Sequence, residues 1–166
     1  MALFEDDEDR EVYLGRWGSE VRERGWRAHA YCLMDNHVHH LVEIPRADLA
    51  AGIRDVHKSY AIYLNRRYGR EGHAFQGRYG CSVPADADGV RYVACYVALN
   101  PVRAGLCATP HAYRWSSHAA AIGSVERPTW LDVRGLLARF GGRRDYLKFL
   151  AAVQLLGMAA PLTPAR

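Results

Sequence analysis

Three histidines lie within four consecutive positions of the segment YCLMDNHVHHLVEIP, residues 31–45. Successive side chains of an extended strand point to opposite faces, so His37 and His39 would share a face and His40 would point the other way. Two imidazoles on one face can bind one metal ion. The pair alone leaves a metal site, a surface patch and a structural role open, while His40 is expected at the edge of the core.

A second group of polar side chains follows helical spacing in ADADGVRYVACYVALNP, residues 85–101. Tyr92, Tyr96 and Asn100 recur every four residues and would form one stripe, while Val93 and Val97 fall on another stripe suited to packing on a sheet. A tyrosine and an amide one turn apart could supply a nucleophile and a metal ligand together. The alternative is that Tyr96 is an amphipathic tyrosine at the edge of the core.

The elements that must position these groups can be read from periodicity and from capping residues. The pattern predicts an α+β fold in which an antiparallel hairpin at residues 26–44 turns at Asp35-Asn36, since both residue types tolerate positive φ. Helices are expected on one face of the sheet. Helices are expected over residues 6–24 and 48–68, ended by Gly25 and Gly69, with Asp48 as the N-cap of the second. A short strand is expected at 80–83, followed by a helix from Asp86 or Asp88 to Asn100 that Pro101 would end. Shorter helices are expected in 116–123, 132–141 and 144–157.

Composition restricts the class of protein. The chain has 166 residues, a formal net charge of +4 and a pI of about 9.0. Its mean hydropathy is −0.25 and it shows no stretch long enough to span a membrane and no secretory signal. The four cysteines are widely spaced, which predicts reduced thiols in a cytoplasmic protein. The basic residues are almost all arginine, which suits phosphate binding, although a GC-rich coding sequence would give the same bias.

Several segments together resemble the REP-associated tyrosine transposases, relatives of the single-tyrosine insertion-sequence transposases of the His-hydrophobic-His class. They are AYCLMDNHVHHLVE, HAFQGRYGCSV, YVALNPVRAGL and YRWSSHAA, in the family's order, and the resemblance covers most of the chain. It implies a ferredoxin-like antiparallel sheet in a transposase-like catalytic domain at residues 1–107, with a C-terminal helical extension at 108–166 packed on it.

The resemblance also implies an activity and its residues. His37 and His39 would be paired metal ligands, Tyr96 the nucleophile and Asn100 the third ligand of Mg²⁺ or Mn²⁺. The enzyme would cut single-stranded DNA beside hairpins through a 5′-phosphotyrosine intermediate. Phosphate contacts or base stacking are expected from a group of polar and basic residues, which are Arg66, Arg67, Arg70, Gln76, Arg78, Tyr79, Arg103 and Arg114. A solvated basic helix end is the alternative for each of them.

Two departures from the family pattern bear on activity. Asp35 replaces the usual proline of the turn, which is a minor change. The family's first strand is apparently missing, and this predicts either a possible homodimer joined through exposed sheet edges or a sheet with fewer strands and a distorted site. Two other functions stay open: a catalytically impaired DNA-binding module of the same fold, and an unrelated zinc hydrolase that would need a further ligand such as Glu43.

Overall fold

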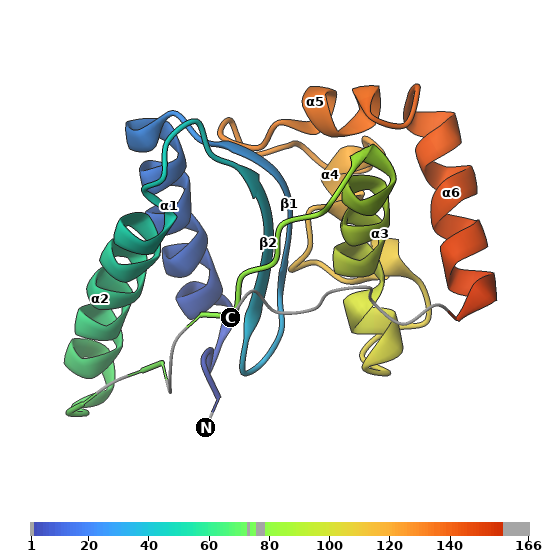
Figure 1. The fold of residues 1–166 in the computed structure, drawn as a ribbon. Coiled ribbons are helices and arrows are strands. Elements are labelled where there is room, and N and C mark those ends of the chain that lie inside the picture. Colours follow the sequence, from blue (N-terminus) through green and yellow to red (C-terminus); the bar gives the residue numbers. More distant parts are fainter. Residues whose placement is uncertain (1, 73, 76–78, 158–166) are drawn as a thin grey trace.

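A computed structural model describes residues 2–72, 74–75 and 79–157 of the chain (Figure 1). The helices and strands follow one another in the order α1 (Asp7–Arg24), β1 (Arg27–Leu33), β2 (Val38–Glu43), α2 (Leu49–Tyr68), α3 (Ala87–Arg103), the 3₁₀-helix η1 (Pro110–Ala112), α4 (His118–Ala121), α5 (Val133–Ala138) and α6 (Arg143–Leu156). The α+β class, the antiparallel hairpin and the C-terminal helices are therefore confirmed.

The hairpin that carries the histidines pairs β1 with β2 from Leu33 opposite Val38 to Arg27 opposite Glu43. The backbone N–H of Met34 donates to the carbonyl of His37 at 2.9 Å, so the turn lies at the predicted residues. The positive φ expected there is wrong, because every positive φ in the described part of the chain belongs to a glycine. The four-residue connection between the strands is long enough to turn without the left-handed conformation that a two-residue turn requires.

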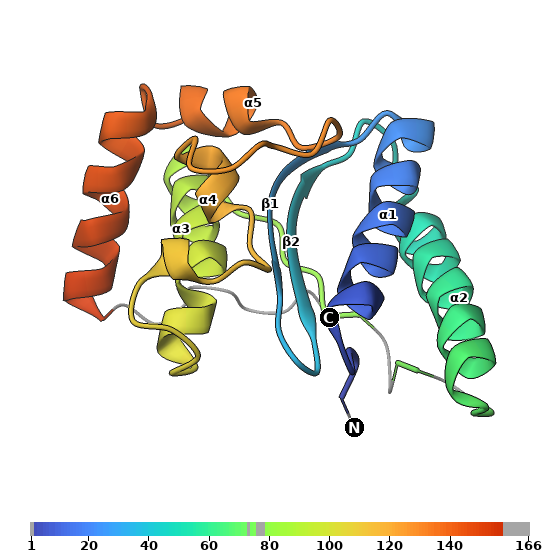
Figure 2. The ribbon, with the colours of Figure 1, turned by 180° about the vertical axis from the view of Figure 1, so that it is seen from behind.

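Helices cover both faces of the hairpin and not one face as expected. Figures 1 and 2 show α1 and α2 on one side and α3 with α6 on the other. Alternation along β1 explains this arrangement. Cys32 packs in one hydrophobic cluster with Val93 and Val97 of α3, and Leu33 packs in a second cluster with Trp17 of α1. Since both faces of β1 are buried, the hairpin is the central layer between two helical layers.

The outer edge of β1 is bonded to the C-terminal part of the same chain. The N–H of Leu33 donates to the carbonyl of Trp115 at 2.9 Å, the N–H of Ser117 donates to Tyr31 at 3.0 Å, and Asp132 donates to Ala28 at 2.8 Å. The described residues form a two-stranded sheet, but this edge is not open. These bonds satisfy backbone groups that we expected a partner chain to satisfy, so pairing through this edge is not required.

Helix ends match the sequence pattern with two exceptions. Gly25 and Gly69 end α1 and α2 in the left-handed conformation, as predicted. Asp48 does not cap α2 with its side chain, because its carboxylate accepts a hydrogen bond from the indole of Trp26 at 2.8 Å. The prediction that Pro101 ends α3 is also wrong, since the helix continues to Arg103. Near a helix end a proline removes only one hydrogen bond, and burial of Pro101 offsets that loss.

The strand predicted at residues 80–83 is absent, because these residues belong to no helix or strand in the structure. They connect the loop after α2 to Asp86, whose side chain accepts a hydrogen bond from the N–H of Gly89 and caps α3. Val83 has 82% of its surface exposed. This short segment therefore does not pair with the hairpin.

Two histidines away from the hairpin make stability depend on pH. Burial lowers the pKa of both His57 and His118 to about 4, and His118 Nδ1 lies 2.8 Å from the Tyr146 hydroxyl. In the unfolded chain they would bind protons near pH 6.5, so the folded state loses stability as pH falls from about 6.5 towards 4. We expect the free energy of unfolding to drop over this interval by up to about 1.4 kcal/mol per pH unit for each histidine.

Urea denaturation at a series of pH values measures this dependence. A His118→Gln variant should show a shallower pH slope than the parent protein, because one of the protons taken up on unfolding is removed. An identical slope in the two proteins would mean that His118 is protonated in the folded state.

Candidate active site

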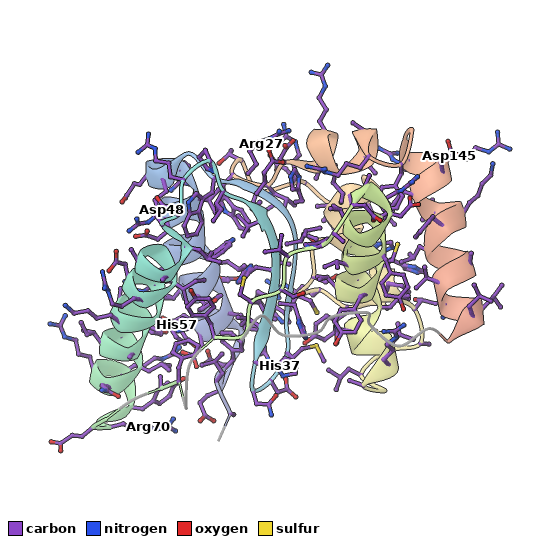
Figure 3. The ribbon with its side chains drawn as sticks, viewed as in Figure 1. Arg27, His37, Asp48, His57, Arg70 and Asp145 are labelled. Atoms are coloured by element: carbon purple, nitrogen blue, oxygen red, sulfur yellow. The ribbon has the colours of Figure 1, made fainter. Side chains whose placement is uncertain are left out.

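The imidazoles of His37 and His39 meet at the turn end of the hairpin. His39 lies in β2 opposite Cys32, and His37 immediately precedes β2. Their ring centroids are 4.8 Å apart, with an interplanar angle of 88°. Figure 3 shows His37 at the turn of the hairpin. The two side chains that alternation placed on one face are thus adjacent in the folded chain.

His40 points to the opposite face and packs against α1. Its ring stacks on Trp17 with the centroids 3.7 Å apart, and its Nε2 lies 3.1 Å from the hydroxyl of Tyr13. Burial, and then repulsion from His39 and His57, lowers the pKa of His40 to about 3. A neutral, stacked histidine of this kind stabilises the core and is turned away from the His37–His39 pair.

The environment of His39 suits a neutral metal ligand. Burial and the proximity of His37 lower its pKa to about 4. Its Nε2 is buried and has no hydrogen-bond partner among the described residues. The Nδ1 of His37 lies 2.7 Å from Oδ1 of Asn36, which can only accept a hydrogen bond. His37 Nδ1 therefore carries the proton, and His37 Nε2 is left with a free lone pair.

Helix α3 brings Tyr96 beside these histidines in the same chain. The ring centroids of His39 and Tyr96 are 5.7 Å apart, in an edge-on arrangement. The guanidinium carbon of Arg103 lies 5.2 Å from the centroid of the Tyr96 ring. Asn100 follows one helical turn after Tyr96, and its Nδ2 donates to the Tyr96 carbonyl at 2.9 Å. Its Oδ1 is the atom of this amide that can accept or coordinate.

The described side chains around the His37–His39 pair do not supply the further carboxylate or thiolate ligand that a zinc-hydrolase site would need. The described residues contain no cluster of three or more His, Cys, Asp or Glu side chains that could hold a metal ion. Glu43, the further ligand considered for zinc, lies at the other end of β2, where its Oε2 accepts from Arg139 at 2.6 Å. Two imidazoles with an amide oxygen are a mixed donor set, and the unpartnered His39 Nε2 is the atom that a cation would satisfy.

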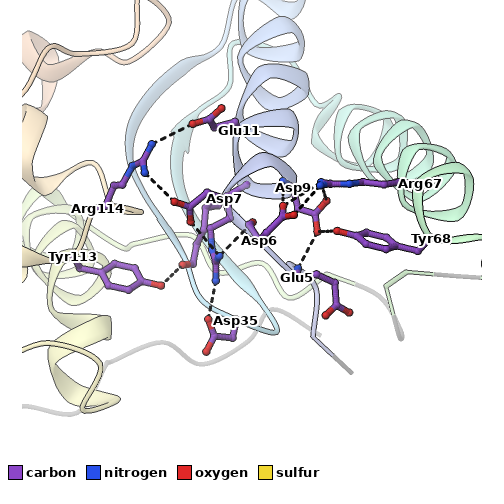
Figure 4. Close-up of polar contacts among 12 residues, drawn as sticks. Glu5, Asp6, Asp7, Asp9, Glu11, Asp35, Arg67, Tyr68, Tyr113 and Arg114 are labelled. Atoms are coloured by element: carbon purple, nitrogen blue, oxygen red, sulfur yellow. Dashed lines mark hydrogen bonds and ion pairs between the residues drawn. The ribbon is translucent and has the colours of Figure 1, made fainter.

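Two of the arginines expected to bind DNA, Arg67 and Arg70, are paired with acids at the start of α1, and Figure 4 shows the pairs of Arg67. Arg67 lies 2.7 Å from both Asp6 and Asp9, and Arg70 lies 2.9 Å from Glu5. Charge complementarity of this kind reduces the positive potential that these side chains offer to phosphate. The sequence grouped them by charge alone, without the acids that face them.

Arg114 is engaged in the same way, 2.9 Å from Asp7 and 3.2 Å from Glu11 (Figure 4). Among the other expected DNA-binding residues, Arg66 and Tyr79 are exposed, while Gln76 and Arg78 lie outside the described residues. Arg103, another residue of this group, has its guanidinium over the ring of Tyr96.

The acid at the centre of these ion pairs is buried. Asp9 is 0% exposed and accepts hydrogen bonds from the hydroxyls of Tyr63 and Tyr68 as well as from Arg67. The backbone N–H of Glu5 supplies a fourth bond. This carboxylate joins the first turn of α1 to the last turns of α2. Asp9 and Arg67 therefore act in holding the two helices together.

We expect Asp9→Asn to lower the free energy of unfolding by about 3 kcal/mol. The amide cannot accept hydrogen bonds from all four donors, so at least one donor would stay buried without a partner. Asp7→Asn is the matched control, because Asp7 is exposed and its pairs should contribute less than about 1 kcal/mol. Urea denaturation of both variants tests this, and equal losses would contradict a special role for the buried carboxylate.

The sequence reasoning missed Asn36 and the cluster around His29. Asn36 precedes His37 directly, so its contact with that imidazole could have been inferred from adjacency. His29 is buried, with Nε2 3.3 Å from Glu43, and Arg27 lies 2.8 Å from Asp132. No sequence signal linked these residues, because Asp132 is distant in the chain and meets β1 only in the folded structure.

Comparison with protein-family models decides the relationship. The model of IS200-like transposases matches residues 3–100, a span that includes the hairpin and ends at Asn100. The chain belongs to the IS200-like transposase family. Membership gives it a transposase-like, DNA-processing function and DNA as a partner, and residues 101–166 lie beyond the match. Comparison with curated proteins and with solved structures found no significant match.

Among the described residues of this IS200-like transposase, no helix is both long and apolar enough to cross a membrane. The division at residue 107 and the cytoplasmic location stay predictions. The contacts of α3 with α6, and of residues 115–117 with β1, show that the C-terminal part packs on the matched part.

Proposed function

We propose that this IS200-like transposase is a metal-dependent endonuclease and strand-transferase that acts on single-stranded DNA beside a hairpin. The observation that supports this most directly is the contact of the His37–His39 pair with Tyr96 within one chain. A nucleophile beside two imidazoles that can bind a cation is an arrangement suited to phosphoryl transfer.

His37, His39 and Asn100 would hold the cation, through the two Nε2 atoms and the amide Oδ1. Mg²⁺ or Mn²⁺ bound there would supply positive charge for the scissile phosphate. Asn36 would keep His37 in the tautomer that leaves Nε2 free, and the buried position of His39 would keep its ring neutral.

Tyr96 would be the nucleophile. Its hydroxyl oxygen would form a bond to phosphorus while the bond to the 3′ oxygen breaks, and this oxygen would take a proton and leave as a free 3′-hydroxyl. The 5′-phosphate would then be linked to tyrosine. Because one phosphodiester replaces another, a 3′-hydroxyl could later reverse the exchange without ATP. Arg103, whose guanidinium lies beside the Tyr96 ring, would bind the phosphate.

The test is incubation of the protein with a labelled DNA that carries a hairpin and a single-stranded flank, with Mg²⁺ or Mn²⁺ present. We expect a shortened strand with a 3′-hydroxyl and a labelled protein–DNA adduct on a denaturing gel, both lost when the cation is chelated. Cleavage without an adduct would exclude the tyrosine mechanism.

A DNA-binding module that has lost catalysis is the second candidate. This candidate predicts binding of hairpin DNA without cleavage under any divalent cation, which the same assay would show.

A further inference from the structure

A basic pocket lies at the end of the molecule where α5 meets α6. The pocket is open, has a volume of about 470 Å³ and is bordered by two arginines, two glycines and an apolar floor. Its residues are Arg127, Val133, Arg134, Leu137, Ala138, Gly141 and Gly142. Helix α6 begins directly after Gly142, so its positive N-terminal end adds to the field of the arginines.

Arg134 of the α5–α6 pocket lining, and Arg143 and Arg144 in the first turn of α6 beside it, differ from the arginines near α1 in having no acidic partner among the described residues. Arg134, Arg143 and Arg144 are exposed, and in the part of the chain that the structure describes none of them forms an ion pair. Both acids closest to this region have a basic partner, and the Asp145 carboxylate also lies beside Gly141 of the pocket lining. Asp132 pairs with Arg27 at 2.8 Å, and Asp145 lies 3.5 Å from Lys148.

Glu43 completes the set of nearby acids and is likewise paired, 2.6 Å from Arg139. Glu126 is exposed and directly precedes Arg127 in the sequence. Its one negative charge is outweighed by the positive charges of the arginines, which are Arg127, Arg134, Arg143 and Arg144. Whereas the acids of α1 neutralise Arg67, Arg70 and Arg114, the α5–α6 pocket keeps its positive potential.

The hairpin gives the distance along its own axis between the start of α5 and the candidate active site. Figure 3 shows Arg27 at one end of the hairpin and His37 at the other. Arg27 contacts Asp132, the residue that caps α5, so α5 begins at the Arg27 end. The seven residues of β1 span about 20 Å at about 3.3 Å per residue. This length matches about six base pairs of duplex at about 3.4 Å per step.

We propose that the α5–α6 pocket binds the phosphodiester backbone of the same DNA that reaches Tyr96. Arginine forks and first-turn N–H groups bind phosphate oxygens, and the apolar floor packs against a sugar or an unstacked base. The protein then holds its substrate at two points separated by the length of the hairpin. This inference rests on the proposed function, because it takes the cleaved DNA as the ligand.

The test uses the full chain and two fluorescent DNA hairpins with the same single-stranded flank, one with a stem of about twelve base pairs and one of about four, on either side of the six-base-pair distance. We expect the variant Arg134→Gln/Arg143→Gln/Arg144→Gln to bind the long stem about tenfold more weakly than the parent. The slope of log affinity against log salt should become shallower by about two to three, at about 0.9 for each phosphate that an arginine no longer neutralises.

The source of the phosphates follows from which probe is affected. A loss confined to the long stem identifies the stem backbone, and a loss of equal size on both probes identifies the single-stranded flank that they share. The matched control is Arg22→Gln/Arg54→Gln/Lys58→Gln, which removes three positive charges from exposed positions of α1 and α2.

The inference is overturned if the pocket variant binds both probes as the parent does, or if the control loses as much affinity, since the effect would then reflect total charge. Arg134→Glu alone should weaken binding further than Arg134→Gln, which guards against a folding defect of the triple variant. Absence of a Tyr96 adduct in the parent would contradict the proposed function but leave the difference in binding intact, so the two failures are distinguishable.

Discussion

Tyr96→Phe should abolish the covalent protein–DNA adduct and lower strand cleavage by about 10³-fold or more, since it removes the one oxygen that would bond to phosphorus. The substitution keeps the aromatic ring that packs edge-on against His39, so the fold should be preserved. Affinity for hairpin DNA should change little, because phosphate contacts elsewhere supply most of it. A denaturing gel with end-labelled DNA measures the adduct, and a binding titration measures affinity.

Tyr92→Phe is the matched control for this prediction. Tyr92 lies one turn before Tyr96 on α3 and is buried, with 7% of its surface exposed. Loss of the Tyr92 hydroxyl should leave the covalent protein–DNA adduct in place. An adduct that persists in Tyr96→Phe would remove Tyr96 as the nucleophile, and an adduct lost only in Tyr92→Phe would move that role one turn along the helix.

His39→Ala and His37→Ala should each reduce cleavage by about 10³-fold, equivalent to several kcal/mol of transition-state stabilisation that the cation would provide. Both should also weaken binding of Mn²⁺, which calorimetry can measure independently of activity. His39 should have the larger effect on Mn²⁺ affinity, since its Nε2 is buried without a partner in the described part of the chain, whereas His37 is exposed.

His40→Ala separates a structural histidine from this pair. Loss of the ring that stacks on Trp17 and contacts Tyr13 should cost about 2–4 kcal/mol of stability, in the range for large-to-small changes in a core. Cleavage by the folded fraction should be retained. If His40→Ala removed Mn²⁺ binding while His39→Ala did not, the assignment of the two faces of β2 would be wrong.

Local sequence signals determined much of the architecture. Gly25 and Gly69 marked the ends of two helices, because a left-handed residue after a helix favours glycine. Alternation put His37 and His39 on one face of the hairpin and His40 on the other, because the side-chain period of a strand is two. Helical spacing put Tyr96 and Asn100 one turn apart. Each of these relations spans only a few residues.

The juxtaposition of Tyr96 with His39 came from the family resemblance, since the spacing within each segment cannot place two segments in contact. The structure brings them together because α3 buries Val93 and Val97 against the same face of β1 that carries Cys32, the partner of His39. Packing of α3 on the hairpin is therefore the step that creates the candidate site.

Charge pairing and edge pairing were decided by the tertiary structure alone. Arg67 and Arg114 looked available for phosphate until the fold brought the acids of α1 to them, because an ion pair depends on distance in space. The edge of β1 looked open until residues 115–117 and 131–132 bonded to it, because any chain segment with free N–H and carbonyl groups can satisfy a strand. Sequence determined the elements and their faces, and only packing decided which distant groups meet.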